Sequence, residues 1–161
     1  MADQGLRFRL PGAAWSLEIP PDGLAVLKKH AQRGWTKREV VGQLYARDLT
    51  TEVVVVDAVT KLRAQWSALT GVGFDLQAAE AEREQLFEQG LHCLGFWHTH
   101  PEPIPHPSGT DLQMAADHAN ASKSLFTGLL FLIVGQASFP QGLGVWLHDG
   151  NQALQATLEE R

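Results

Sequence analysis

Cysteine is nearly absent from this sequence, because among its 161 residues only Cys93 carries a thiol. A single cysteine excludes an internal disulfide bond and a zinc knot built from several thiolates. We therefore expect a protein of a reducing compartment.

Basic runs and long apolar runs are also missing. Thirteen Lys and Arg stand against eighteen Asp and Glu, which gives a net charge of −5. A mildly acidic chain without a basic cluster is poorly suited to binding the phosphate backbone of a nucleic acid. The longest apolar stretch, 126–134, has nine residues, whereas a membrane helix needs about 20, and the N-terminus lacks the apolar core of a signal peptide. We expect a cytoplasmic protein with no nucleic-acid partner and no membrane partner.

The composition that remains is that of an ordinary globular domain. The chain is 44% apolar and 19% charged, which is typical of globular proteins, and its length allows one real core. No internal repeat or linker divides it. We expect a single domain over residues 1–161, with its core over about 15–150.

Hydrophobic periodicity predicts a mixture of strands and helices, and therefore an α/β fold. Strands are expected over 6–10 and 15–19, over 39–46 and 52–59 as a pair, and over 91–98, 126–134 and 143–147. Helices are expected from Pro20 to roughly Gly34, over 76–89 between the cap Asp75 and Gly90, and over 109–121. Residues 60–74 show no clear period and are expected to form a loop, which in a compact domain is often functional.

One stretch carries the chemistry, reading HTHPEPIPHPSGTD from His98 to Asp111. Side chains at i and i+2 of a strand leave from the same face, so His98 and His100 could share one metal ion. Asp111 can return across the loop as a third ligand, and four intervening prolines stiffen that loop. Imidazole and carboxylate suit Zn²⁺, whose catalytic sites keep an open position for water. We expect one zinc ion per chain.

Hydrolysis of an amide at such a site also needs a base. Zinc lowers the pKa of its water from about 15.7 to about 7, but a separate group must pass the proton to the leaving amine. Glu39, at the start of an apolar strand, is the candidate. Each residue also has a plainer interpretation: Ser108 and Asp111 match a helix capping box, two histidines are ordinary strand polarity, and a lone glutamate is usually exposed. Only their joint spacing favours a metal site.

These residues together resemble the signature of the JAMM (JAB/MPN) metalloproteases. Glu39-Val-Val-Gly42 is followed by His98-x-His100, seven residues, Ser108, two residues and Asp111, with a proline after the second histidine. The resemblance implies a JAB/MPN domain of cytidine-deaminase-like fold, in which helices flank a mixed central sheet. It also implies that His98, His100 and Asp111 bind zinc with a water, that Glu39 is the general acid/base, and that Ser108 donates a hydrogen bond to the developing oxyanion.

The resemblance further implies a substrate class. JAMM enzymes cleave isopeptide or peptide bonds after the C-terminal glycine of ubiquitin or a ubiquitin-like protein. The short segment after Asp111 is similar to that of compact bacterial deubiquitinase-like members, which occur in anti-phage defence operons (CBASS or ubiquitin-like conjugation operons) beside E1- and E2-like enzymes. By position, residues 60–74 would hold the substrate tail, with Trp66 and Phe74 as apolar contacts.

Other interpretations stay open. The chain could be a non-catalytic MPN-type binding module or a small-peptide hydrolase of the same fold, whereas a nucleobase deaminase is disfavoured because its zinc site needs a Pro-Cys-x-x-Cys pair. Strand alternation predicts that Cys93 lies on the face opposite His98, as a buried structural thiol and not a nucleophile. We expect His106 to be an exposed loop residue and His118 to be a packed residue, with an outer-shell role as its alternative.

Overall fold

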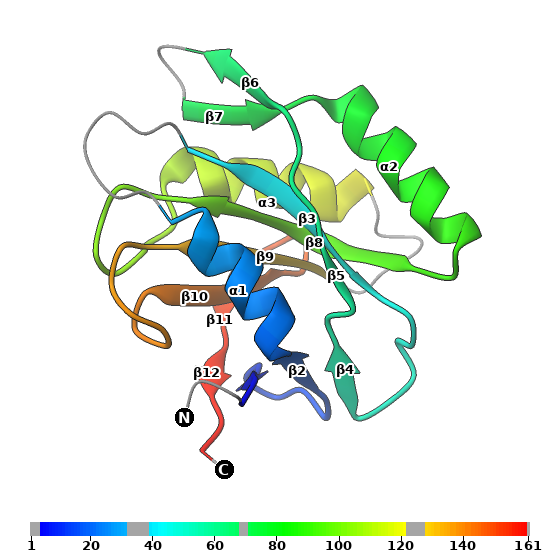
Figure 1. The fold of residues 1–161 in the computed structure, drawn as a ribbon, viewed down its shortest axis with the longest axis vertical. Coiled ribbons are helices and arrows are strands. Elements are labelled where there is room, and N and C mark those ends of the chain that lie inside the picture. The colour runs from blue at the N-terminus through cyan, green and yellow to red at the C-terminus, as the bar shows by residue number, and fades with distance from the viewer. Residues whose placement is uncertain (1–3, 32–38, 68–70, 122–127, 161) are drawn as a thin grey trace.

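The computed structural model describes residues 4–31, 39–67, 71–121 and 128–160 (Figure 1). The described part of the chain is built around a six-stranded sheet in the order β11-β10-β9-β8-β3-β5. Its strands are β3 (Val41–Ala46), β5 (Ala58–Val59), β8 (His92–Thr99), β9 (Leu129–Val134), β10 (Leu143–His148) and β11 (Ala153–Gln155). Strands β8 and β9 run parallel and the other pairs antiparallel. This mixed sheet with flanking helices is the architecture that the sequence predicted.

Two further layers cover the central sheet. One face carries helix α1 (Pro21–Lys29) and a second sheet of order β12-β1-β2-β4. The strands of this second sheet are β1 (Leu6–Arg9), β2 (Ser16–Ile19), β4 (Val53–Val55) and β12 (Thr157–Leu158). The other face carries helices α2 (Leu76–Glu88) and α3 (Gly109–Ala121). Each helix of the described ranges is too short or too polar to cross a lipid bilayer.

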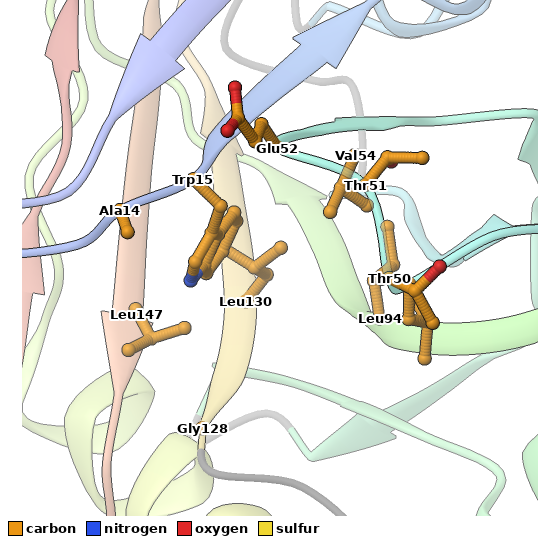
Figure 2. A pocket seen from close by; sticks show the side chains of 11 residues that line it. Ala14, Trp15, Thr50, Thr51, Glu52, Val54, Leu94, Gly128, Leu130 and Leu147 are labelled. Carbon is orange, nitrogen blue, oxygen red and sulfur yellow. The ribbon is translucent and has the colours of Figure 1, made fainter.

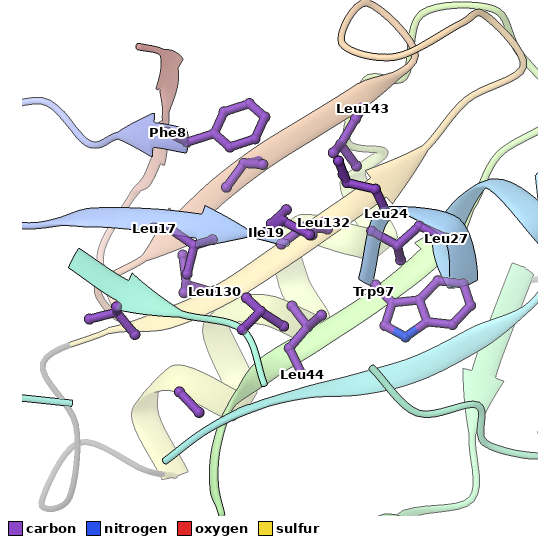
Figure 3. Packing of buried hydrophobic residues seen from close by; sticks show 14 of the residues in the cluster. Phe8, Leu17, Ile19, Leu24, Leu27, Leu44, Trp97, Leu130, Leu132 and Leu143 are labelled. Carbon is purple, nitrogen blue, oxygen red and sulfur yellow. The ribbon is translucent and has the colours of Figure 1, made fainter. Parts of the chain in front are cut away.

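The apolar core is divided by the central sheet into two parts. Between the two sheets and α1, fully buried side chains such as Leu27, Leu132 and Trp97 interlock (Figure 3). On the other face, Phe96, Phe131 and small residues of α2 and α3 fill the second part. Burying one such large side chain contributes about 1.5–3 kcal/mol, so packing on both faces stabilises the position of β8 in the sheet.

The local signals for α2 and α3 are confirmed. The Asp75 side chain caps α2 by accepting a hydrogen bond from the Ala78 backbone N–H at 3.1 Å, and Gly90 follows the helix with a positive φ of 81°, a conformation that costs glycine little. Helix α3 begins at Gly109 as expected. Helix α1 ends at Lys29 and is therefore shorter than predicted. The predicted end, near Gly34, lies outside the described residues.

Two segments differ from their predicted structure. Residues 52–59 do not form one strand: β4 pairs with β2 in the second sheet, and only β5 pairs with β3 as expected. Residues 60–74 were predicted to be a loop, but β6 (Ala64–Ser67) and β7 (Gly71–Phe74) pair as an antiparallel hairpin. Glycine is depleted in strands, and Gly71 and Gly73 lie in β7, which is why the sequence did not reveal this hairpin.

A bulge in β8 overturns the prediction that Cys93 lies opposite His98. Leu44 pairs with Gly95 and Tyr45 with Cys93, so Leu94 has no partner in the register. Leu94 packs against the core part between the two sheets, while the Cys93 sulfur lies 3.7 Å from Gln43 Oε1 on the α2 face. One extra residue in the strand moves everything before it to the opposite face.

Candidate metal centre

The histidines of the predicted site stand at the carboxyl end of β8. His98 is the penultimate residue of that strand, and His100 directly follows it with its backbone N–H donating to the Val134 carbonyl of β9 at 2.9 Å. The chain therefore remains extended across both residues, and their rings lie on one side, with centroids 4.7 Å apart. This confirms the placement expected from the i, i+2 spacing.

Asp111 joins them because β8, α3 and β9 form a crossover connection. Parallel strands require such a connection, and it returns the first turn of α3 to the end of β8. Asp111 Oδ1 lies 3.1 Å from His98 Nε2, and Asp111 Oδ2 lies 3.1 Å from His100 Nε2. The three residues are the group of described side chains that could hold a metal ion.

The plainer interpretation of Ser108 and Asp111 is confirmed at the same time. The Ser108 hydroxyl oxygen accepts the Asp111 backbone N–H at 3.1 Å, and Asp111 Oδ2 accepts the Ser108 N–H at 2.8 Å. This is a reciprocal capping box, and the positive end of the helix also favours the carboxylate. Capping and ligation do not compete here, because the cap fixes the Asp111 rotamer that faces the histidines.

The donor set fits a divalent metal ion. Bonds of about 2.0–2.1 Å in a tetrahedral arrangement would separate ligand atoms by about 3.3 Å, and the contacts between ligand atoms here are 3.0–3.1 Å. His98 and Asp111 are only 2% and 8% exposed. Three lone-pair donors that converge in a buried place repel one another unless a proton or a cation lies between them.

The charges of the centre shift two pKa values in opposite directions. Burial alone would lower the pKa of His100, but hydrogen bonds to Asp111 and Glu102 outweigh it and raise this pKa to about 9. Burial alone would raise the pKa of Asp111, but hydrogen bonds from His100 and His98 hold it well below its usual value. Asp111 is therefore ionised at neutral pH, and a cation is favoured at this place.

Glu39 lies across from His100 at the entry to β3. It is half-buried and stands two residues before the first residue of that strand, Val41, which pairs with His98. Its negative charge contributes to the raised pKa of His100. Glu39 is therefore an acidic side chain close to the candidate metal ligands.

Thr99 ties that segment to β8 in an unusual way. The Val40 N–H donates to the Thr99 hydroxyl at 2.9 Å, while the Thr99 N–H donates to the Val40 carbonyl at 3.0 Å. A side-chain oxygen thus replaces a backbone carbonyl as the acceptor in the ladder. Thr99 is fully buried and was not singled out from the sequence, since a threonine in a strand is ordinary.

Glu102 is the second residue that sequence reasoning missed. Its Oε1 atom lies 3.1 Å from His100 Nδ1 and accepts the His106 N–H at 2.9 Å. A carboxylate two residues after a ligand histidine was the available signal, but nothing in the spacing distinguished it from a solvated loop acid.

The remaining residues considered from the sequence lie outside the ligand group. His106 is exposed. His118 packs on Phe96, with ring centroids 5.8 Å apart, and burial lowers its pKa. Burial raises the pKa of the Cys93 thiol, which opposes nucleophilic reactivity, and five residues along a strand place it about 16 Å from His98. Trp66 and Phe74 belong to the β6–β7 hairpin, where Trp66 pairs with Val72 and Ala64 with Phe74.

A cavity of about 380 Å³ lies elsewhere, between the second sheet and the ends of β8, β9 and β10 (Figure 2). Trp15, Leu130 and Leu147 give it apolar walls. Its threonine hydroxyls bond within their own loop, Thr50 to Asp48 and Thr51 to the Val53 carbonyl. None of the metal-ligand candidates lines it.

Comparison with known proteins identifies the family of this chain. The sequence matches the family described as prokaryotic homologs of the JAB domain over residues 21–146, and the chain therefore belongs to that family. No functionally curated protein shows significant similarity to the sequence.

Solved structures support the fold. A solution structure of a protein from Desulfitobacterium hafniense is 20% identical, with a TM-score of 0.62, and covers 88% of each chain. A solution structure of a protein from Salinibacter ruber is 23% identical, with a TM-score of 0.53, and again covers 88% of each chain. At these identities the likeness concerns the fold alone.

Proposed function

We propose that this protein is a zinc-dependent isopeptidase or peptidase that cleaves after the C-terminal glycine of a ubiquitin-like protein or its conjugates. One observation carries the proposal: two imidazole nitrogens and a carboxylate converge within 3.1 Å of one another. Glu39, just before β3, lies close enough for its charge to help raise the pKa of His100. The JAB family includes metalloproteases, and the ligand set here is complete.

Zinc, when bound, would polarise the substrate carbonyl and make a water acidic enough to attack it. His98, His100 and Asp111 would hold the ion, so none of them is free to move a proton. Glu39 would accept the proton from the water and pass it to the leaving amine. Burial around the site would strengthen the effect of the zinc charge on the carbonyl and on the water, because charges interact more strongly where water is excluded.

Ser108 would stabilise the developing oxyanion. Its hydroxyl oxygen already accepts the Asp111 N–H at 3.1 Å, so its own proton remains available for donation, and the residue is exposed. Loss of an oxyanion donor typically costs about 2.7–4 kcal/mol of transition-state stabilisation. The capping bond would hold the hydroxyl in place for this role.

The substrate and pathway follow from the resemblance to compact bacterial JAMM enzymes. The β6–β7 hairpin, with Trp66 and Phe74, is the proposed contact for a glycine-ended tail. Partner E1- and E2-like enzymes, a cytoplasmic location and a role in anti-phage defence belong to the same proposal.

Glu39→Gln tests the proposal, with the exposed Glu52→Gln as its matched control. We expect both variants to bind one zinc per chain, and only Glu39→Gln to lose cleavage of a ubiquitin-like protein extended beyond its terminal glycine. Zinc binding without turnover by the wild type would favour a non-catalytic binding module. Turnover of short peptides alone would favour a small-peptide hydrolase.

A further inference from the structure

We infer that Glu102 is a positioning residue that fixes the tautomer and ring orientation of His100 for metal binding. The inference rests on the zinc site of the proposed function and not on its protease activity. The two histidines of the centre differ in their second ring nitrogen. His100 Nδ1 lies 3.1 Å from Glu102 Oε1, whereas the buried His98 Nδ1 has no partner within the described part of the chain.

This contact decides which nitrogen of His100 can bind a metal. A neutral imidazole has one N–H and one lone pair. A carboxylate at Nδ1 keeps the proton on that atom, which leaves the lone pair on Nε2, the atom that faces Asp111 at 3.1 Å. Ligand histidines commonly donate their other N–H to such a partner, and loss of that partner typically lowers metal affinity or activity 10–100-fold.

The carboxylate is held in place before any metal arrives. The Glu102 carbonyl accepts the Gln136 N–H at 2.8 Å, and the next carbonyl, that of Pro103, accepts the Ala137 N–H at 3.0 Å. Gly135 permits this close approach, because a Cβ there would lie 2.5 Å from the Pro103 oxygen. The Glu102 side chain is further restrained by the His106 N–H at 2.9 Å.

The four prolines of this loop add to the restraint, because proline removes conformational freedom from the chain. The loop after His100 therefore has two tasks. It returns the chain to α3, which carries Asp111, and it presents one carboxylate to the far side of His100. A positioned partner of this kind lowers the cost of ordering the ligand at the moment of binding.

Glu102→Ala and Glu102→Gln test the inference, with the exposed Glu84→Ala on α2 as control. Zinc affinity is measured by competition with a chromophoric chelator, and geometry by the visible spectrum of the Co²⁺-loaded protein. We expect Glu102→Ala to bind zinc about 10–100-fold more weakly with an altered Co²⁺ spectrum. Glu102→Gln retains an acceptor oxygen, so it should recover most of the affinity and the wild-type spectrum.

The melting temperature of each metal-free variant separates positioning from folding. We expect it to match the wild type for Glu102→Gln, so that variant keeps the test valid even where Glu102→Ala is less stable. Unchanged zinc affinity in Glu102→Ala, or equal losses in the Ala and Gln variants, would overturn the inference. Wild-type protein that binds zinc but cleaves nothing would contradict the proposed protease function and leave this result standing.

Discussion

The affinity for zinc should depend strongly on pH, because His100 must give up a proton to bind the ion. In the metal-free protein both of its ring nitrogens face acceptors, Asp111 Oδ2 at 3.1 Å and Glu102 Oε1 at 3.1 Å. That arrangement stabilises the imidazolium and raises the pKa of His100 to about 9. Zinc requires the lone pair on Nε2, so zinc and the proton compete.

The size of the effect follows from that pKa. At pH 7, two units below a pKa of about 9, about 1% of the His100 rings are neutral, so the affinity should be about 100-fold below its limit. It should rise about tenfold per pH unit from pH 6.5 and level off near pH 9.

Stability should show opposite signs in the two states. The pKa of His100 is raised from an unfolded value of about 6.5, so its contribution to metal-free stability is complete below pH 6.5 and is lost as pH rises towards 9. With excess zinc, stability should instead increase over the same range, because binding strengthens.

Chelator competition and thermal melts between pH 6 and 9.5 measure both effects, with His106→Ala as the control, since His106 is exposed and outside the ligand group. A zinc affinity that is constant from pH 6.5 to 8.5 would refute the reasoning, as would metal-free stability that rises with pH over that interval.

Three further predictions concern the metal centre and the strands that support it. Thr99→Val should destabilise the protein by about 1–3 kcal/mol, because it leaves the Val40 N–H without its acceptor, and it should lower kcat more than zinc affinity. Denaturant melts and kinetics test this with Thr99→Ser as the control, and the prediction fails if the two variants behave alike. Gly42→Ala should lower the free energy of unfolding by about 1–3 kcal/mol through overpacking, since a Cβ would overlap the Thr60 carbonyl. Gly109→Ala is the control, because a Cβ there would enter open space. Equal melting temperatures of the two variants would count against the packing argument. Zinc at about 100 times its Kd should stabilise the protein by about 2.7 kcal/mol, and a chelator should reverse the gain in a thermal melt; a melting temperature insensitive to zinc would argue against the site.

Local chemistry explains why parts of the fold could be predicted from the sequence. The cap at Asp75 and the positive φ at Gly90 bound α2 through interactions within a few residues. The His98–His100 pair is similarly local, because strand geometry alone makes side chains two residues apart point to the same face. Even the plain interpretation of Ser108 and Asp111 as a capping box was correct.

Long-range pairing explains what was missed. The segment 52–59 changes sheets between Val55 and Ala58, so its two halves pair with strands of different sheets, β2 and β3. The bulge at Leu94 reverses the face of Cys93 without a change in composition that the sequence would reveal. Register depends on the neighbouring strand as well as on the residues of the strand itself.

The sequence by itself determined the family, the candidate ligand residues, and the strand and helix beside which they lie, because these features depend on residue types and spacings within short segments. The tertiary structure alone decided that Glu102 faces His100 Nδ1 and that the Thr99 hydroxyl replaces a ladder carbonyl. These contacts depend on how a loop folds back and how two strands align, and such geometry arises only when distant parts of the chain pack together.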